Sequence, residues 1–256
     1  MKILKFKKQS KDKYKLYLDN NSDITLYEDV IIKNNLLITK EISDELLETL
    51  KKQNNDMYAY TLAVGYISVK MRSIKEINDY LIKKGFNNLV ANKVSERLIK
   101  EGYLNDLKYA KSFINDSMNL TNKGPQKIKM ELIKYGVNKD IIESEIALID
   151  QRKVEEKLNK LIDKELKIKK GSQNAIKIKI INHFVNLGYS KDLVTSILMS
   201  KEITSDKSKL KKDYAKLYNK YKVKYNGQEL LYFISQKLYS KGYTASDIKE
   251  VLKEEN

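Results

Sequence analysis

The chain has 256 residues, with 50 Lys and Arg against 34 Asp and Glu, so its formal net charge is +16. Hydrophobic residues make up 41% of the chain and cysteine is absent, which excludes a chain disordered by composition, a disulfide scaffold and any cysteine-based metal or catalytic site. The charge favours an acidic partner, which would be nucleic acid, an anionic membrane surface or an acidic protein.

Residues 1–40 predict a small β-rich segment. The stretches ILKF, YKLYL and ITLY are short and rich in β-branched or aromatic residues, and turn-like SKDK and DNNSD separate them. We expect a three-strand meander, followed by a connecting helix over 41–56 with Ser43 as its N-cap. No apolar core of a signal peptide and no run of about 18 apolar residues is present, so we expect a cytoplasmic protein without membrane association.

The remainder of the chain repeats one helical signature. Four glycines recur at intervals of 51, 52 and 54 residues, each followed by an apolar residue and then by Asn, Ser or Thr; they are Gly85, Gly136, Gly188 and Gly242. Glycine ends a helix in the left-handed conformation, and the polar residue caps the next helix. With a further helix before each pair, we expect a mainly α protein made of tandem three-helix repeats at 57–104, 105–150, 151–204 and 205–256.

No catalytic signature occurs in the sequence. It has no phosphate loop, dinucleotide fingerprint, hydrolase nucleophile elbow or zinc-protease motif. One histidine and no cysteine exclude a conventional zinc site. We therefore expect no enzyme activity, no cofactor and no bound metal.

Basic residues recur near the start of the second helix of the first three repeats. In the second repeat, Gly124 and Pro125 predict a helix start, and helical spacing directs Lys127 and Lys134 outward. The free N–H groups at such helix starts also favour a phosphate or carboxylate. The alternative is that these lysines only keep the surface hydrated. The candidate contact residues for an acidic partner are Arg72, Lys123, Lys127, Lys134, Lys177 and Lys179.

A second basic cluster spans 207–224, with eight lysines and one acid. It also contains Tyr214, Tyr218 and Tyr221. These tyrosines either stack on nucleic-acid bases or form the apolar face of the first helix of the fourth repeat.

Three stretches resemble the RecX family of recombination regulators. They are RSIKEINDYLIKKGF (Arg72–Phe86), GYLNDLKYAKSFI (Gly102–Ile114) and KGPQKIKMELIKYGV (Lys123–Val137), in the order and spacing of that family. The resemblance is strong over about residues 57–150, and the repeat pattern continues to the C-terminus.

The resemblance implies a curved, elongated array of three-helix modules that binds the RecA recombinase, notably its filament on single-stranded DNA. It implies a protein that modulates, and mostly inhibits, the recombinase and is not an enzyme. We also expect a monomer. A stand-alone nucleic-acid-binding module is the alternative, and it predicts a steep dependence of DNA affinity on salt. A metal-dependent nuclease is a third class, and the lack of clustered acids and histidines argues against it.

Overall fold

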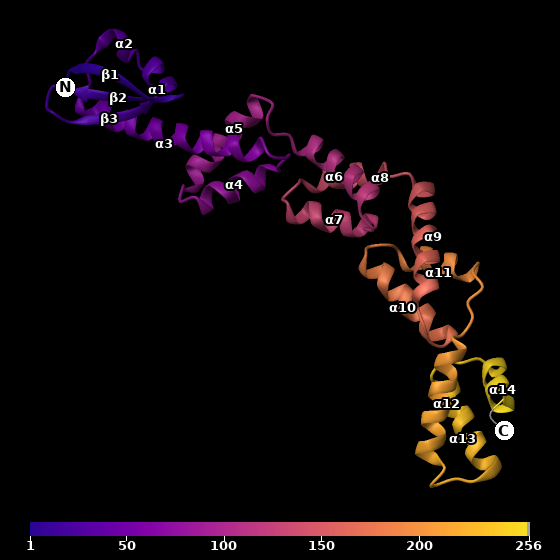
Figure 1. Cartoon of the computed structure of the whole chain (residues 1–256). Helices are drawn as coiled ribbons and strands as arrows, with labels where there is room; N and C mark the ends of the chain where they lie inside the picture. The colour runs from indigo at the N-terminus through magenta and orange to yellow at the C-terminus, as the bar shows by residue number, and fades with distance from the viewer. Residues whose placement is uncertain (255–256) are drawn as a thin grey trace. The chain divides into compact units, whose positions relative to one another are not determined.

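The computed structural model describes residues 1–254 (Figure 1). The described chain is mainly helical, with one small sheet near its N-terminus. The elements, in order, are β1 (Ile3–Ser10), β2 (Lys13–Leu18), β3 (Asp23–Tyr27), α1 (Glu28–Lys33), α2 (Leu36–Thr39), α3 (Asp44–Ile67), α4 (Ile74–Lys83), α5 (Asn88–Lys100), α6 (Asp106–Leu120), α7 (Pro125–Lys134), α8 (Lys139–Ala147), α9 (Gln151–Ile168), α10 (Gln173–Asn186), α11 (Lys191–Met199), α12 (Lys207–Tyr221), α13 (Gly227–Ser240) and α14 (Ala245–Glu254).

The three strands form the expected antiparallel meander in the order β1-β2-β3. Phe6, Leu16 and Ile24 lie opposite one another on the face that packs on a hydrophobic core. Apolar residues of α1, α2 and the start of α3 complete this core, including Val30, Leu36 and Leu50. Helices α1 and α2 fall inside the segment for which the sequence predicted only strands and turns.

Helix α3 is continuous from Asp44 to Ile67. It begins at Ser43, whose side chain accepts a hydrogen bond from the Leu46 N–H, as expected of an N-cap. No proline or helix-ending glycine interrupts the chain at Met57, where the sequence suggested a new segment. One helix therefore contributes Leu50 to the core of the sheet and Ala59 and Ala63 to the next core.

The chain divides into two compact units. Unit 1 comprises Met1–Ala110 and Ile133–Ile141, and unit 2 comprises Lys111–Leu132 and the chain from Ile142 onward. In unit 1, α3, α4 and α5 pack around Ile77, Leu81 and Leu98. In unit 2, α9, α10 and α11 pack around Leu158, Ile180 and Val194, and α12, α13 and α14 pack around Leu210, Ile234 and Val251.

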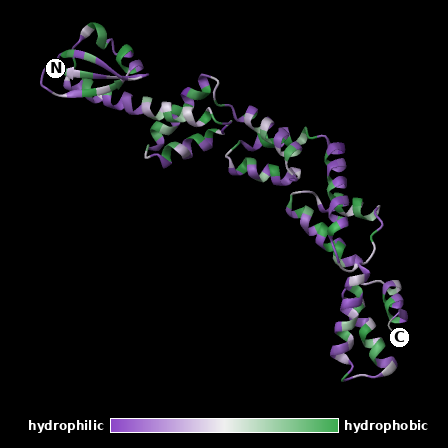
Figure 2. Ribbon diagram, viewed as in Figure 1, coloured by the Kyte–Doolittle hydropathy of each residue, from purple (hydrophilic) through white to green (hydrophobic). Residues whose placement is uncertain are grey.

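The helix-ending glycines adopt the conformation that the repeat signature predicted. Gly85, Gly136, Gly188 and Gly242 have φ of 95°, 77°, 90° and 83°. The polar residues two positions later accept N–H hydrogen bonds of the next helix, as Asn87 does from Val90. Figure 2 shows hydrophobic and hydrophilic residues alternating along the helices, as amphipathic helices that bury one face require.

Candidate functional site

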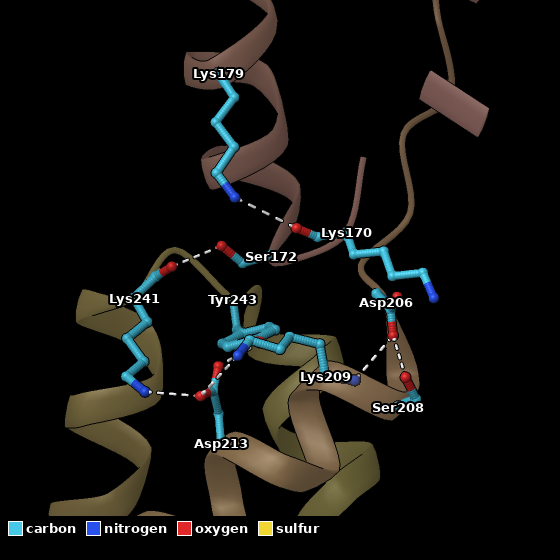
Figure 3. A network of polar contacts seen from close by, with 9 residues as sticks. All are labelled: Lys170, Ser172, Lys179, Asp206, Ser208, Lys209, Asp213, Lys241 and Tyr243. Carbon is cyan, nitrogen blue, oxygen red and sulfur yellow. Dashed lines mark hydrogen bonds and ion pairs between the residues drawn. The ribbon is translucent and has the colours of Figure 1, made fainter. Parts of the chain in front are cut away.

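From α3 onward the helices follow one another in triplets, which are α3–α5, α6–α8, α9–α11 and α12–α14. In three of these triplets, the start of the second helix contacts a later turn of the same unit. In unit 1, the Ser73 hydroxyl, at the start of α4, donates to the Tyr135 carbonyl at 2.6 Å. In unit 2, the Ser172 hydroxyl, at the start of α10, donates to the Lys241 carbonyl at 2.6 Å (Figure 3). Each accepting carbonyl directly precedes a helix-ending glycine, Gly136 or Gly242. The glycine turn of one triplet therefore docks on the helix start of the triplet before it.

The start of helix α7 contacts the later turn through its main chain, because glycine stands where the other two helices have serine. The Gly124 N–H donates to the Leu187 carbonyl at 2.7 Å, and the Gln126 N–H donates to the Gly188 carbonyl at 3.1 Å. A Cβ on Gly124 would lie only 2.6 Å from the Gly188 backbone. Two main chains thus meet directly here, which requires glycine on both sides.

The sequence predicts that free N–H groups at these helix starts favour a phosphate or carboxylate, and acceptors within the chain already bind some of these groups. The Ile74 N–H donates to the Asp106 carboxylate at 3.0 Å, and the Gln173 N–H donates to the Ser205 hydroxyl at 3.1 Å. At α7 the later turn supplies the acceptor. Acceptors within the chain therefore bind N–H groups at each of these starts, and binding of an external acidic group there stays a prediction.

Arg72 is largely buried in unit 1. Its side chain is 11% exposed, its guanidinium lies 3.8 Å from the centre of the Tyr66 ring, and its Nη1 is 3.4 Å from a Glu76 oxygen. Glu76 in turn accepts from the Ser73 N–H at 3.0 Å, completing a capping box. The Arg72 side chain therefore organises the start of α4 and presents little charge to solvent.

The five candidate lysines differ in how free their ammonium groups are. Lys123 is half-buried, and its Nζ lies 2.6 Å from Glu131. Lys127 and Lys134 are exposed on α7, as predicted, and neither forms an ion pair within residues 1–254. On α10, Lys177 is half-buried, and Lys179 is exposed with its Nζ 3.5 Å from the Lys170 carbonyl (Figure 3).

The six candidates do not lie in one compact unit. Arg72 and Lys134 belong to unit 1, and the other four belong to unit 2. Lys123 and Lys127 flank the start of α7, whereas Lys177 and Lys179 lie on α10. Of the six, Lys127, Lys134 and Lys179 have the most exposed side chains for an external acidic group.

A polar network that the sequence did not predict lies where Lys241 meets α12. Asp213 is only 8% exposed and accepts from Lys241 at 3.0 Å and from the Tyr243 hydroxyl at 2.9 Å (Figure 3). Burial raises the pKa of Asp213, but these two hydrogen bonds outweigh it, so the pKa is lowered overall. Burial and the bond to Asp213 raise the pKa of Tyr243. The network fastens the glycine turn of α13–α14 to α12.

The tyrosines of the basic cluster at 207–224 mostly serve the core. Tyr214 is buried in the core of α12, α13 and α14, and Tyr221 packs against the same core. Tyr218 stacks on Tyr214 with ring centres 5.9 Å apart and keeps an exposed edge. The prediction that these tyrosines form the apolar face of the helix is therefore confirmed for Tyr214 and Tyr221.

Within residues 1–254, no group of three or more His, Cys, Asp or Glu side chains is arranged to hold a metal ion. The same residues contain no helix with the length and hydropathy needed to cross a bilayer.

Comparison with known proteins identifies the family. The model of the first three-helix domain of RecX matches residues 59–98, and that of the second matches residues 105–144. The chain is 36% identical to the regulatory protein RecX of Streptococcus uberis, over 99% of both chains. It belongs to the RecX family. The RecX of Streptococcus agalactiae is 32% identical, again over 99% of both chains.

Two solved RecX structures share the fold. A crystal structure of regulatory protein RecX covers 77% of this chain and 98% of its own, with a TM-score of 0.68 and 22% identity. That of RecX from Lactobacillus salivarius covers 57% of this chain and 96% of its own, with a TM-score of 0.53 and 27% identity. The fold of three-helix modules is therefore shared with solved RecX proteins, and the relatives of this chain are named regulatory proteins.

Proposed function

We propose that this member of the RecX family binds a RecA-type recombinase, on its single-stranded-DNA filament, and depresses ATP hydrolysis and strand exchange. It would thereby regulate DNA repair and recombination in the cytoplasm, without catalytic activity or a cofactor of its own. The observation that carries the proposal is family membership over the full length of relatives named regulatory proteins. The net charge of +16 adds support, because a nucleoprotein filament is an acidic partner.

The contacts we propose come from exposed lysines at several places in the chain. The side chains of Lys127, Lys134 and Lys179 are exposed. Two further candidates close to them in the sequence, Lys123 and Lys177, are half-buried. Arg72 would contribute by holding the start of α4, since its guanidinium is stacked on Tyr66. Several weak contacts spread along one chain give avidity when the partner is a repeating filament.

Recombinase ATP hydrolysis on single-stranded DNA, with the purified chain titrated in, tests this function. The proposal predicts that hydrolysis falls as the chain is added. Unchanged hydrolysis at a stoichiometric ratio would contradict it.

The second candidate function is stand-alone nucleic-acid binding, which the excess of lysine favours. It predicts that the chain binds single-stranded DNA without recombinase, with an affinity that falls steeply with salt. DNA binding that survives the loss of Lys127 and Lys134 charge, together with lost ATPase inhibition, favours the recombinase as the partner.

A further inference from the structure

A groove of about 880 Å³ lies beside α9 in unit 2. The C-terminal half of α6, the connection between α8 and α9, and one face of α9 form its walls, and all of these residues belong to unit 2. The six candidate residues discussed above are not among its lining residues.

A row of lysines forms the α9 wall. Lys153, Lys157, Lys160 and Lys164 follow one another at steps of four, three and four residues, so they share one face of the helix. At 1.5 Å per residue the row extends over about 16 Å. Like charges at this spacing destabilise a helix, so repulsion within the row adds nothing to the stability of α9.

Three of these lysines are exposed and form no ion pair within the described chain: Lys153, Lys160 and Lys164. Two nearby acids of α9 are engaged elsewhere, since Asp163 pairs with Lys201 at 2.8 Å and Glu165 pairs with Lys169 at 2.9 Å.

The acids that line the groove neutralise only part of its charge. Glu145 lies 3.8 Å from Lys111, and the Asp150 carboxylate accepts from the Arg152 N–H at 2.9 Å. Glu156 is the remaining acid among the lining residues. The lysine row therefore leaves an excess of positive charge facing the groove.

Lys157 has a different role from its neighbours. Its ammonium is half-buried and donates to the Met118 carbonyl at 2.7 Å and to the Lys123 carbonyl at 3.3 Å. Burial lowers the pKa of this ammonium. Lys157 thus fastens the end of α6 and the α6–α7 connection to α9, which fixes the distance between the walls.

Apolar and amide side chains form the rest of the lining. Leu120 and Leu148 are 80% and 75% exposed, although both are large hydrophobic residues. Asn115 and Asn119 of α6 add hydrogen-bonding groups. No aromatic side chain lines the groove within the described chain, so it offers no platform for stacking bases.

We propose that this groove binds an acidic, amphipathic segment of a partner protein. Carboxylates of the segment pair with Lys153, Lys160 and Lys164, and its apolar side chains cover Leu120 and Leu148. A helix with Glu at the same steps of four and three residues matches the row, in the manner of helix-in-groove recognition. The site goes beyond the regulation proposed above, because its test needs only this chain and a synthetic peptide, with no recombinase present.

The test is fluorescence anisotropy of the full chain with a labelled synthetic peptide of about four helical turns. The peptide has Glu at the spacing of the lysine row and Leu on the adjoining face. Lys160→Glu with Lys164→Glu is expected to weaken binding at least about tenfold. The matched control is Lys212→Glu with Lys216→Glu, an exposed pair at the same spacing on α12, and it is expected to leave binding unchanged. Equal loss in both pairs would overturn the proposal, because net charge alone would then explain binding.

A second pair of variants tests the apolar contacts. Leu120→Ser with Leu148→Ser is expected to weaken peptide binding several-fold without lowering the thermal midpoint, because both side chains are exposed. Met199→Ser with Val223→Ser replaces exposed apolar residues outside the groove and is expected to have no effect. If labelled oligothymidylate loses affinity on Lys160→Glu with Lys164→Glu while the peptide does not bind, the groove is a nucleic-acid site and the proposal fails.

Discussion

The Ser172 hydroxyl donates a 2.6 Å hydrogen bond to the carbonyl of Lys241, which lies 69 residues further along the chain. The same hydroxyl accepts from the Ala175 N–H, so one side chain both caps α10 and anchors a distant turn. Ser73 makes the equivalent pair of bonds with Glu76 and Tyr135. A short polar side chain at a helix start thereby connects successive helix triplets.

Ser172→Ala is expected to lower the free energy of unfolding by about 2 kcal/mol, because it removes both a cap and a buried hydrogen bond. Chemical denaturation followed by circular dichroism measures this. The control is Ser190→Ala, which removes only the cap of α11 and should cost about 1 kcal/mol. Equal costs for the two variants would mean that the bond to Lys241 contributes nothing.

Gly188→Ala is expected to destabilise unit 2 more than Gly85→Ala destabilises unit 1. Both glycines have positive φ, 90° and 95°, so both substitutions strain the backbone by about 1 kcal/mol. A Cβ at Gly188 would also lie 2.6 Å from the Lys127 Cβ, whereas a Cβ at Gly85 has nothing within 4 Å. Overpacking adds about 1–3 kcal/mol at Gly188 alone. Similar thermal midpoints for the two variants would contradict the close docking of this turn on α7.

Asp213→Asn is expected to make unit 2 less stable at neutral pH and less sensitive to acid. The folded-state pKa of Asp213 is lowered, so the stability that this carboxylate contributes is present above its unfolded pKa of about 4 and is lost as pH falls through the lower folded value. Thermal midpoints measured from neutral pH downward should therefore converge for the two proteins below about pH 4. Tyr243→Phe keeps the Asp213 carboxylate but removes one of its hydrogen-bond donors. The thermal midpoint of this variant at neutral pH should therefore lie between those of the unchanged chain and Asp213→Asn. Parallel pH profiles would rule out this role of Asp213.

Much of the local structure could be predicted from the sequence. The three strands, the glycine turns and the caps at Ser43 and Thr244 depend on residues close in sequence, where turn and capping chemistry is specific. The partners of Ser73 and Ser172 could not be predicted, because they lie 62 and 69 residues away and no local pattern encodes such pairing.

The candidate site was less predictable. An arginine before a helix cap is typical of a surface position, yet Arg72 is buried because Tyr66 and Glu76 face it from its own triplet. The lysine row from Lys153 to Lys164 was not among the predicted contact residues, although its spacing is present in the sequence. That these lysines line a groove could not be predicted, because the groove forms only where α6 and α9 pack together.

Lys127→Glu with Lys134→Glu is expected to weaken inhibition of the recombinase at least about tenfold, because it reverses two exposed charges at a proposed contact. The control is Lys83→Glu with Lys100→Glu, an exposed pair outside the proposed contacts that changes the net charge equally. Inhibition curves of recombinase ATP hydrolysis compare the two. If the control loses as much inhibition, the contact is not local to α7.

The most direct test of the central claim is the rate of ATP hydrolysis by a RecA-type recombinase on single-stranded DNA as this chain is titrated in. We expect the rate to fall progressively and to reach a low plateau near stoichiometric amounts. An unchanged rate at that ratio, with the chain folded, would contradict the claim that it regulates the recombinase.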